Sequence, residues 1–145
     1  MPRTYSNVVV PVDFSGESAL AIQSGLEVVD DASQLHLIHV LLPLEVMSPG
    51  VLLGDISDES RKEKVSENLT KLAEEHGAAG ARLAVLFGTP GLEITDYAKL
   101  QKAELIVIPS HGYHGVKRLV LGSVAERVIR HAECSVLLLR RSDAE

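Results

Sequence analysis

Five short apolar runs recur along the chain, and each has the length and composition of a β-strand. The runs are rich in valine, leucine and isoleucine and lack the strict alternation expected of a strand with one wet face. Continuous apolar strands are typical of a parallel sheet that is covered on both sides. The predicted strands are Asn7–Val12, Gln34–Val40, Ala81–Phe87, Leu105–Ile108 and Ser135–Arg140.

Between these runs, apolar residues are spaced by three and four, which predicts helices with one buried face. The second helix is expected over Asp58–His76, with Gly77 as its stop, and the fourth over Ser123–Ala132. Thr89 and Pro90 have the residue types of a cap and a first helical position. The positions expected to face the core are Ala19, Ile22, Leu26 and Val29; Val65, Leu69, Leu72 and Ala73; Ile94, Tyr97 and Ala98; and Ala125, Val128, Ile129 and Ala132.

Strands and helices alternate along the whole chain, apart from a long irregular segment at residues 41–56 that contains prolines and glycines. Alternation with short links and right-handed crossovers predicts an α/β fold. The expected architecture is a doubly wound five-stranded parallel sheet in the order 3-2-1-4-5, with helices on both faces. Residues 1–145 are expected to form a single domain.

Composition and charge narrow the classes of partner. The net charge is −6, so no nucleic acid is expected as a partner. There is no tryptophan, so a platform on which bases could stack is not expected either. No run approaches the roughly 20 apolar residues of a membrane helix, so no membrane insertion is expected. The start of the chain lacks an apolar signal-peptide core, and Cys134 has no partner for an internal disulfide. Both features favour a cytoplasmic location.

The loops after the first and fourth strands hold the candidate chemistry. In open parallel sheets, ligands bind beyond the carboxyl ends of the strands where the strand order reverses, here between strands one and four. The loop 109–123 contains Gly112 and Gly115, which allow close backbone approach, and Gly122-Ser123 opens the last helix. A helix N-terminus has unpaired N–H groups and a positive dipole end, both suited to phosphate.

This loop resembles the second half of the nucleotide-binding signature of universal stress proteins, G-x2-G-x9-G-[S/T]. Gly112 is followed by nine residues and then by Gly122-Ser123. Segments 10–13, 39–40, 124–132 and 136–140 also resemble that family, so the resemblance covers nearly the whole chain.

One position departs from the signature, because Pro109 replaces its first glycine. Proline has no N–H and a fixed φ. If the glycine serves close approach to the ribose, Pro109 narrows the sugar pocket; if only its carbonyl matters, Pro109 is tolerated.

The resemblance implies a site for ATP, or for AMP or ADP, with Mg²⁺ as a further candidate. It places Asp13 and Val40 beside the adenine, and Pro11 and Ile108 as walls of the base and ribose. The phosphates would be held by backbone N–H groups and by the Ser123 hydroxyl. The full implied set is Pro11, Val12, Asp13, Val40, Ile108, Pro109, Gly112, Gly122, Ser123 and Val124.

Two of these residues also have structural interpretations. Ser123 and Glu126 have the spacing of a capping box, a role that is compatible with phosphate binding by other N–H groups. Asp13 is a candidate helix cap, or a turn residue with Ser15.

Other polar residues are expected to have no role in binding or catalysis. Lys117 and Arg118 fit a solvated face better than a phosphate clamp. His111 and His114 have no third ligand at a helpful spacing, so no metal site is predicted. His36 and His39 alternate with apolar residues and are predicted to be structural.

Three functions remain in competition. The leading hypothesis is a nucleotide-responsive stress protein that acts on an unknown protein partner, with no catalytic residue and at most very slow ATP hydrolysis. It is predicted to form a homodimer through Val136–Leu139, an apolar run at a sheet edge, as the family resemblance also implies. The second hypothesis is a nucleotide-free interaction module of the same fold. The third is an enzyme of the nucleotide-α-hydrolase type, although residues 13–18 lack the phosphate motif that it needs.

Overall fold

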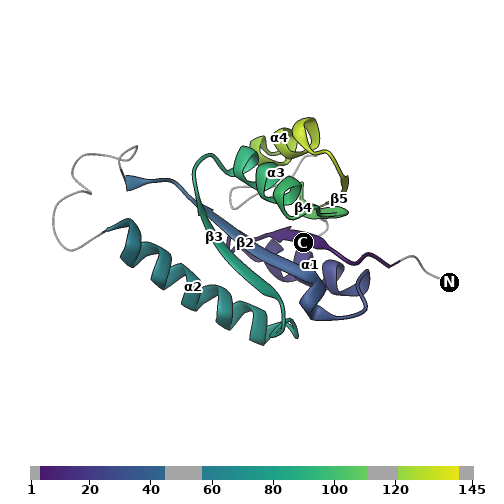
Figure 1. The fold of residues 1–145 in the computed structure, drawn as a ribbon, viewed down its shortest axis with the longest axis horizontal. Coiled ribbons are helices and arrows are strands. Elements are labelled where there is room, and N and C mark those ends of the chain that lie inside the picture. Colours follow the sequence, from purple (N-terminus) through teal and green to yellow (C-terminus); the bar gives the residue numbers. More distant parts are fainter. Residues whose placement is uncertain (1–3, 45–56, 111–120, 141–145) are drawn as a thin grey trace.

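A computed structural model describes residues 4–44, 57–110 and 121–140. These residues contain a five-stranded sheet in the order β3-β2-β1-β4-β5, in which every pair of neighbours is parallel (Figure 1). The predicted fold class and strand order are therefore confirmed. The elements are β1 (Val8–Pro11), α1 (Glu17–Glu27), η1 (Ala32–Gln34), β2 (Leu35–Leu41), α2 (Asp58–Glu75), β3 (Arg82–Phe87), α3 (Pro90–Leu100), β4 (Leu105–Pro109), α4 (Ser123–His131) and β5 (Ser135–Leu139).

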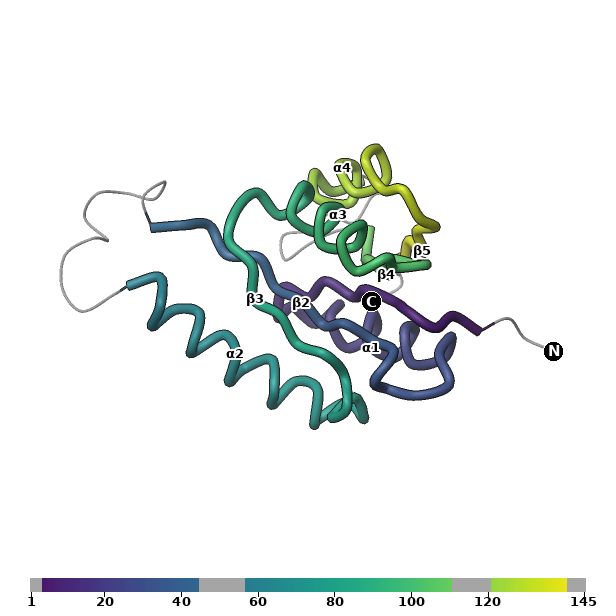
Figure 2. The backbone as a smooth tube through the Cα atoms, viewed as in Figure 1, coloured from purple at the N-terminus to yellow at the C-terminus, as the bar shows by residue number. Residues whose placement is uncertain are grey.

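The helices cover the sheet on both faces, with α1 and α2 on one side and α3 and α4 on the other (Figure 2). The central strand β1 shows why its sequence is continuously apolar. Val8 and Val10 pack in the core beneath α1 and α2, whereas Val9 packs in the core beneath α3 and α4. All three have no exposed surface. Alternate residues of β1 therefore serve two separate cores, as a doubly covered parallel strand requires.

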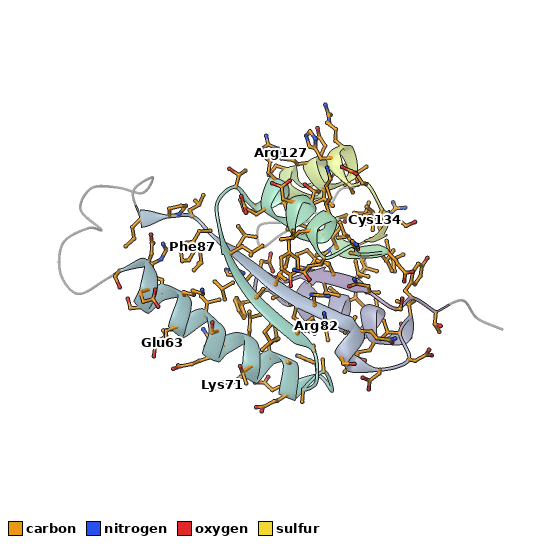
Figure 3. The ribbon with its side chains drawn as sticks, viewed as in Figure 1. Glu63, Lys71, Arg82, Phe87, Arg127 and Cys134 are labelled. Carbon is orange, nitrogen blue, oxygen red and sulfur yellow. The ribbon has the colours of Figure 1, made fainter. Side chains whose placement is uncertain are left out.

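Helix α2 has a narrow buried stripe and a charged outer face. Leu69 and Ala73 are buried, while Glu63 and Lys71 point away from the sheet (Figure 3). Its N-cap is Ser57, which forms reciprocal hydrogen bonds with Ser60. Within the described ranges, every helix is too short or too polar to cross a lipid bilayer.

One predicted core position, Val29, packs against the core from outside its predicted helix, and another, Ile129, is exposed. Val29 falls after the end of α1 and forms an isolated parallel bridge with Tyr5. Ile129 is 44% exposed, because α4 buries only a narrow face through Ala125 and Val128. Most of the predicted irregular segment, residues 45–56, lies outside the described residues.

Candidate functional site

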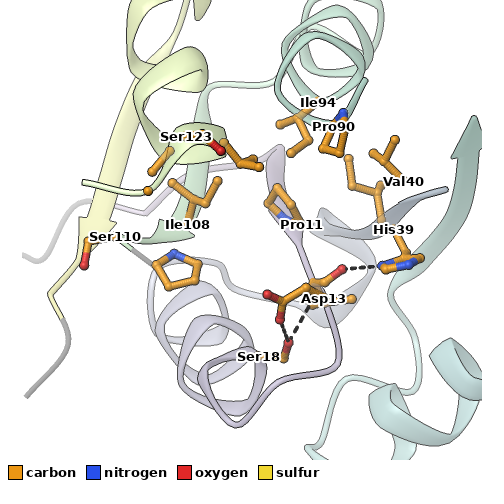
Figure 4. Close-up of a pocket in the computed structure, with 16 residues that line it drawn as sticks. Pro11, Asp13, Ser18, His39, Val40, Pro90, Ile94, Ile108, Ser110 and Ser123 are labelled. Atoms are coloured by element: carbon orange, nitrogen blue, oxygen red, sulfur yellow. Dashed lines mark hydrogen bonds between the residues drawn. The ribbon is translucent and has the colours of Figure 1, made fainter. Parts of the chain in front are cut away.

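A cavity of about 240 Å³ lies at the carboxyl ends of β1 and β4, where the strand order reverses (Figure 4). Its walls come from the ends of β1, β2 and β4 and from the first turns of α3 and α4. Every predicted site residue that the structure describes lines it: Pro11, Val12, Asp13, Val40, Ile108, Pro109, Gly122, Ser123 and Val124. Gly112 lies outside the described residues, as do His111, His114, Lys117 and Arg118.

The cavity exists because the sheet opens between β1 and β4. The pairing of β1 with β2 continues to Pro11 and Ile38, whereas its pairing with β4 stops two residues earlier, at Val9 and Ile106. Beyond that pair, the two strands share no ladder contacts in the described structure. The crevice is thus a feature of backbone pairing.

Two prolines account for this early end. The N–H of Val12 donates to the Ile38 carbonyl at 2.8 Å, so the backbone N–H and C=O of residue 12 point toward β2. By alternation, the backbone polar groups of residue 11 point toward β4. Likewise, the N–H of Ser110 donates to the Leu139 carbonyl on β5, so the backbone of residue 109 points its polar groups toward β1. In the same register, the next two bonds between β1 and β4 would need N–H groups at Pro11 and Pro109. Proline has none, so the ladder cannot continue.

The loop after β1 is held by Asp13. Its Oδ1 accepts hydrogen bonds from the Ser15 N–H at 3.0 Å and from the Ser18 hydroxyl at 3.3 Å. The predicted turn with Ser15 is confirmed, and the cap of α1 is Gly16 instead of Asp13. The Oδ1 atom of Asp13 therefore helps to hold the shape of the loop.

His39 lies at the same edge of the cavity. Its Nδ1 is 2.7 Å from the Val12 carbonyl oxygen, and its ring lies 4.9 Å from that of Phe14 (Figure 4 for His39). The sequence predicted His39 to be structural and did not indicate that it borders the cavity. Its position beside Val40, at the end of a strand, was the only signal in the sequence.

Helix α4 begins at Ser123 as predicted, but its cap differs from the prediction. Gly122 is the N-cap, with an extended backbone (φ −65°, ψ 155°), and Ser123 is the first helical residue. The predicted capping box is therefore wrong. The Glu126 N–H donates to the Gly122 carbonyl at 2.9 Å, and the Glu126 carboxylate accepts from Arg130 at 2.8 Å.

This start of α4 decides which N–H groups can meet a ligand. Gly122 donates its N–H to the Ser110 carbonyl at 2.7 Å, so the predicted phosphate contact from that group is not available in this state. The first-turn N–H groups of Ser123, Val124 and Ala125 have no partner in their own helix. All three residues line the cavity. In the described part of the chain, the Ser123 hydroxyl makes no hydrogen bond.

The structure adds residues that sequence reasoning did not assign to the site. They come from the start of α1, the middle of β2, the first turns of α3 and α4, and the end of β4: Ser18, Ile38, His39, Pro90, Ile94, Ser110 and Ala125. Ile94 was predicted only as a core residue, since nothing local shows that α3 reaches the crevice. No group of three potential metal ligands occurs among the described residues.

A second histidine is buried on β2, the strand that also carries His39. His36 is only 2% exposed, and its Nδ1 is 2.8 Å from the Tyr97 hydroxyl. Burial lowers the pKa of His36, and the charge of Arg82 on the neighbouring strand lowers it further. Burial also raises the pKa of Tyr97. Both groups are therefore held in their neutral forms near neutral pH.

The family model described as the universal stress protein family matches residues 4–140. The universal stress protein MJ0531 of Methanocaldococcus jannaschii is 32% identical over 149 residues, which cover 97% of this chain and 85% of that protein. The universal stress protein YxiE of Bacillus subtilis is 30% identical over 148 residues, which cover 94% of this chain and 99% of the relative.

Solved structures show the same fold. The hypothetical protein PH0823 superposes with a TM-score of 0.73 at 28% identity, covering 97% of this chain and 98% of its own. A universal stress protein crystallised in complex with cAMP superposes with a TM-score of 0.66 at 22% identity, covering 96% and 99%. From the family match, its relatives and the shared fold, we conclude that this chain belongs to the universal stress protein family.

Proposed function

We propose that this chain binds an adenine nucleotide, ATP or its products ADP and AMP, in the cavity between the ends of β1 and β4. The observation that carries the proposal is the opening of the sheet at the strand-order reversal, with the free end of α4 on its rim. A family member of the same fold was solved with cAMP, which is also an adenine nucleotide.

The walls of the cavity suit a base and a sugar. Val40, Ile94 and Ile108 offer aliphatic side chains, and Pro11 and Pro90 offer apolar ring surface (Figure 4). The volume of about 240 Å³ is smaller than the roughly 300–1,000 Å³ of pockets that enclose whole ligands. A nucleotide would therefore place its base and ribose inside and its phosphates at the mouth.

The mouth suits phosphate because α4 begins there. The N–H groups of Ser123, Val124 and Ala125 and the Ser123 hydroxyl would meet an anion, aided by the positive end of the helix dipole. Mg²⁺ would be bound by the phosphates, since the described residues gather no group of three metal ligands.

We propose binding without efficient turnover. Among the described residues that line the cavity, Asp13 is the one carboxylate, and its Oδ1 accepts hydrogen bonds from Ser15 and Ser18. A carboxylate that maintains a turn is poorly placed to activate water. The bound nucleotide would then act as a signal, read by an unknown partner protein through the loops that it orders.

The protein is further proposed to work in the cytoplasm as a homodimer through β5. The single cysteine, Cys134, is compatible with a reducing compartment. Strand β5 forms one edge of the sheet, and Leu137 on it is 37% exposed. An apolar edge strand invites pairing with a second copy.

A native mass spectrum of the freshly purified protein tests the nucleotide proposal. We expect a mass increment of AMP, ADP or ATP on part of the population. Ser123→Glu should lose it, because the new carboxylate repels phosphate at the mouth. The same carboxylate should stabilise α4 by about 0.3–1 kcal/mol through the helix dipole, so misfolding would not explain the loss.

Ser123→Gln is the matched control, since it has the shape of glutamate without the charge. It should retain more nucleotide than Ser123→Glu. Equal retention of nucleotide by the two variants would contradict the placement of the phosphates at α4.

A further inference from the structure

The hydrogen bond between His39 and Val12 alters the edge of the cavity in a specific way. In a regular parallel ladder, the Val12 carbonyl would accept the N–H of Val40, because Val12 donates to Ile38, two residues earlier on β2. Instead, the Val12 carbonyl lies 2.7 Å from the Nδ1 of His39. A carbonyl only accepts, so Nδ1 carries the proton in this contact.

The consequence falls on the backbone of Val40. The Gly88 N–H donates to the Leu41 carbonyl at 2.9 Å, which shows that position 41 faces β3. By alternation, the N–H and C=O of Val40 face the side of β1. Among the described residues, neither group finds a backbone partner on β1, and Val40 lines the cavity.

A strained residue supports the His39 ring. Phe14 has a φ of 64°, in the left-handed region that is unusual for a bulky side chain. This backbone places its ring 4.9 Å from the imidazole of His39, at an angle of 54°. Strain of this kind persists only where the surroundings enforce it, and here it accompanies a fixed orientation of the imidazole.

We propose that His39 is a positioning residue: by occupying the Val12 carbonyl, it keeps the Val40 N–H and C=O open to the cavity, where they select the base. A neighbouring donor and acceptor match the adenine edge, which offers an acceptor at N1 and an amino donor at N6. Hypoxanthine has the opposite pattern, with N1–H and O6. The selectivity rests on the proposed nucleotide function, whereas the open Val40 amide is a property of the unliganded chain.

The pair His39→Asn and His39→Gln tests this role in the full chain. The amide nitrogen of asparagine stands near the place of Nδ1 and can still donate to the Val12 carbonyl, whereas that of glutamine stands near Nε2 and cannot. Both replacements are polar, so neither places an apolar group beside the loop. His39→Ala removes the donor altogether.

Two measurements apply to each protein. Amide hydrogen exchange followed by NMR without ligand should show an unprotected Val40 N–H in the wild type and in His39→Asn. Protection should appear in His39→Gln and His39→Ala, where the freed Val12 carbonyl can pair with Val40. Calorimetry with ATP and with ITP should show a preference for ATP that falls by about tenfold in the same two variants, the value of roughly one hydrogen bond.

The outcomes separate the two proposals. A protected Val40 amide in the wild type, or identical exchange in all four proteins, would overturn the role of His39. An unchanged ratio of ATP to ITP affinity in His39→Gln and His39→Ala would also overturn it. If the exchange pattern follows the expectation but the wild type binds neither nucleotide, the role of His39 in exposing Val40 stands and the nucleotide function falls.

Discussion

Pro109 affects the site through the N–H that it lacks. The sequence left two outcomes open for this departure from the family signature: a narrowed pocket or a tolerated change. In the structure, Pro109 lies in the wall of an open cavity and pairs with Leu139 on β5. Its nitrogen faces Pro11 across the crevice and carries no proton, so it cannot donate to the Pro11 carbonyl there.

Replacing Pro109 by alanine should close part of the crevice. The restored N–H can donate to the Pro11 carbonyl and extend the ladder between β1 and β4 by one bond. We expect ATP affinity to fall by up to about tenfold, because one added hydrogen bond would stabilise the closed crevice of the unliganded protein by about that factor. Pro109→Gly, measured by the same titration, should behave alike. A gain of affinity in Pro109→Gly would instead favour the nucleotide-free interaction module.

His36 should make the stability of the protein depend on pH. Because its pKa is lowered in the folded state, the unfolded chain binds the proton more readily below the ordinary histidine pKa of about 6.5. The contribution of His36 to the free energy of unfolding is therefore fully present above that pH. It decreases as the pH falls below that value, by at most about 1.4 kcal/mol per pH unit for one proton. Urea unfolding between pH 7.5 and pH 5 measures this slope. His36→Gln should reduce it, and an unchanged slope would show that other groups are responsible.

The helices and strands were more predictable than their ends. The apolar runs indicated all five strands, because a doubly covered strand such as β1 must be apolar at every position. The start of α4 at Ser123 was predicted correctly, but its cap was not: Ser123 and Glu126 have the spacing of a capping box, whereas Gly122 is the cap and Glu126 pairs with Arg130. That choice depends on backbone angles at Gly122, which no local pattern specifies.

The site itself was predictable only in part. Residues at the ends of β1 and β4 could be placed from topology alone. The contributions of Pro90 and Ile94 depend on how α3 packs, and the contact of His39 with Val12 depends on the register of two strands. Such long-range facts leave no signature in a single sequence.

The two edge strands give a direct test of the proposed dimer. Leu137 on β5 and Leu83 on β3 are almost equally exposed, at 37% and 38%, but lie on opposite edges of the sheet. Leu137→Lys should give a monomer in sedimentation at micromolar concentration, because lysine disfavours edge pairing. Leu83→Lys should remain dimeric. A monomeric wild type, or a dimer that survives Leu137→Lys and is lost in Leu83→Lys, would reject the β5 interface.

The described fold combines a sheet covered on both faces with a site that backbone pairing leaves open. Its two cores lie on opposite faces of the sheet, and the crevice is formed where β1 and β4 end. An acidic chain with a net charge of −6 must attract a nucleotide locally, through the start of α4, because its overall field repels anions. Binding should therefore weaken little with added salt compared with a protein of high positive charge.

Calorimetric titration of the folded chain with ATP tests the central claim most directly. We predict saturable binding of one nucleotide per chain, with adenosine binding more weakly because it lacks phosphates to meet the N–H groups of α4. The absence of any heat at millimolar ATP, in a protein shown to be folded by circular dichroism and free of co-purified nucleotide, would contradict the claim that the crevice between β1 and β4 is a nucleotide site.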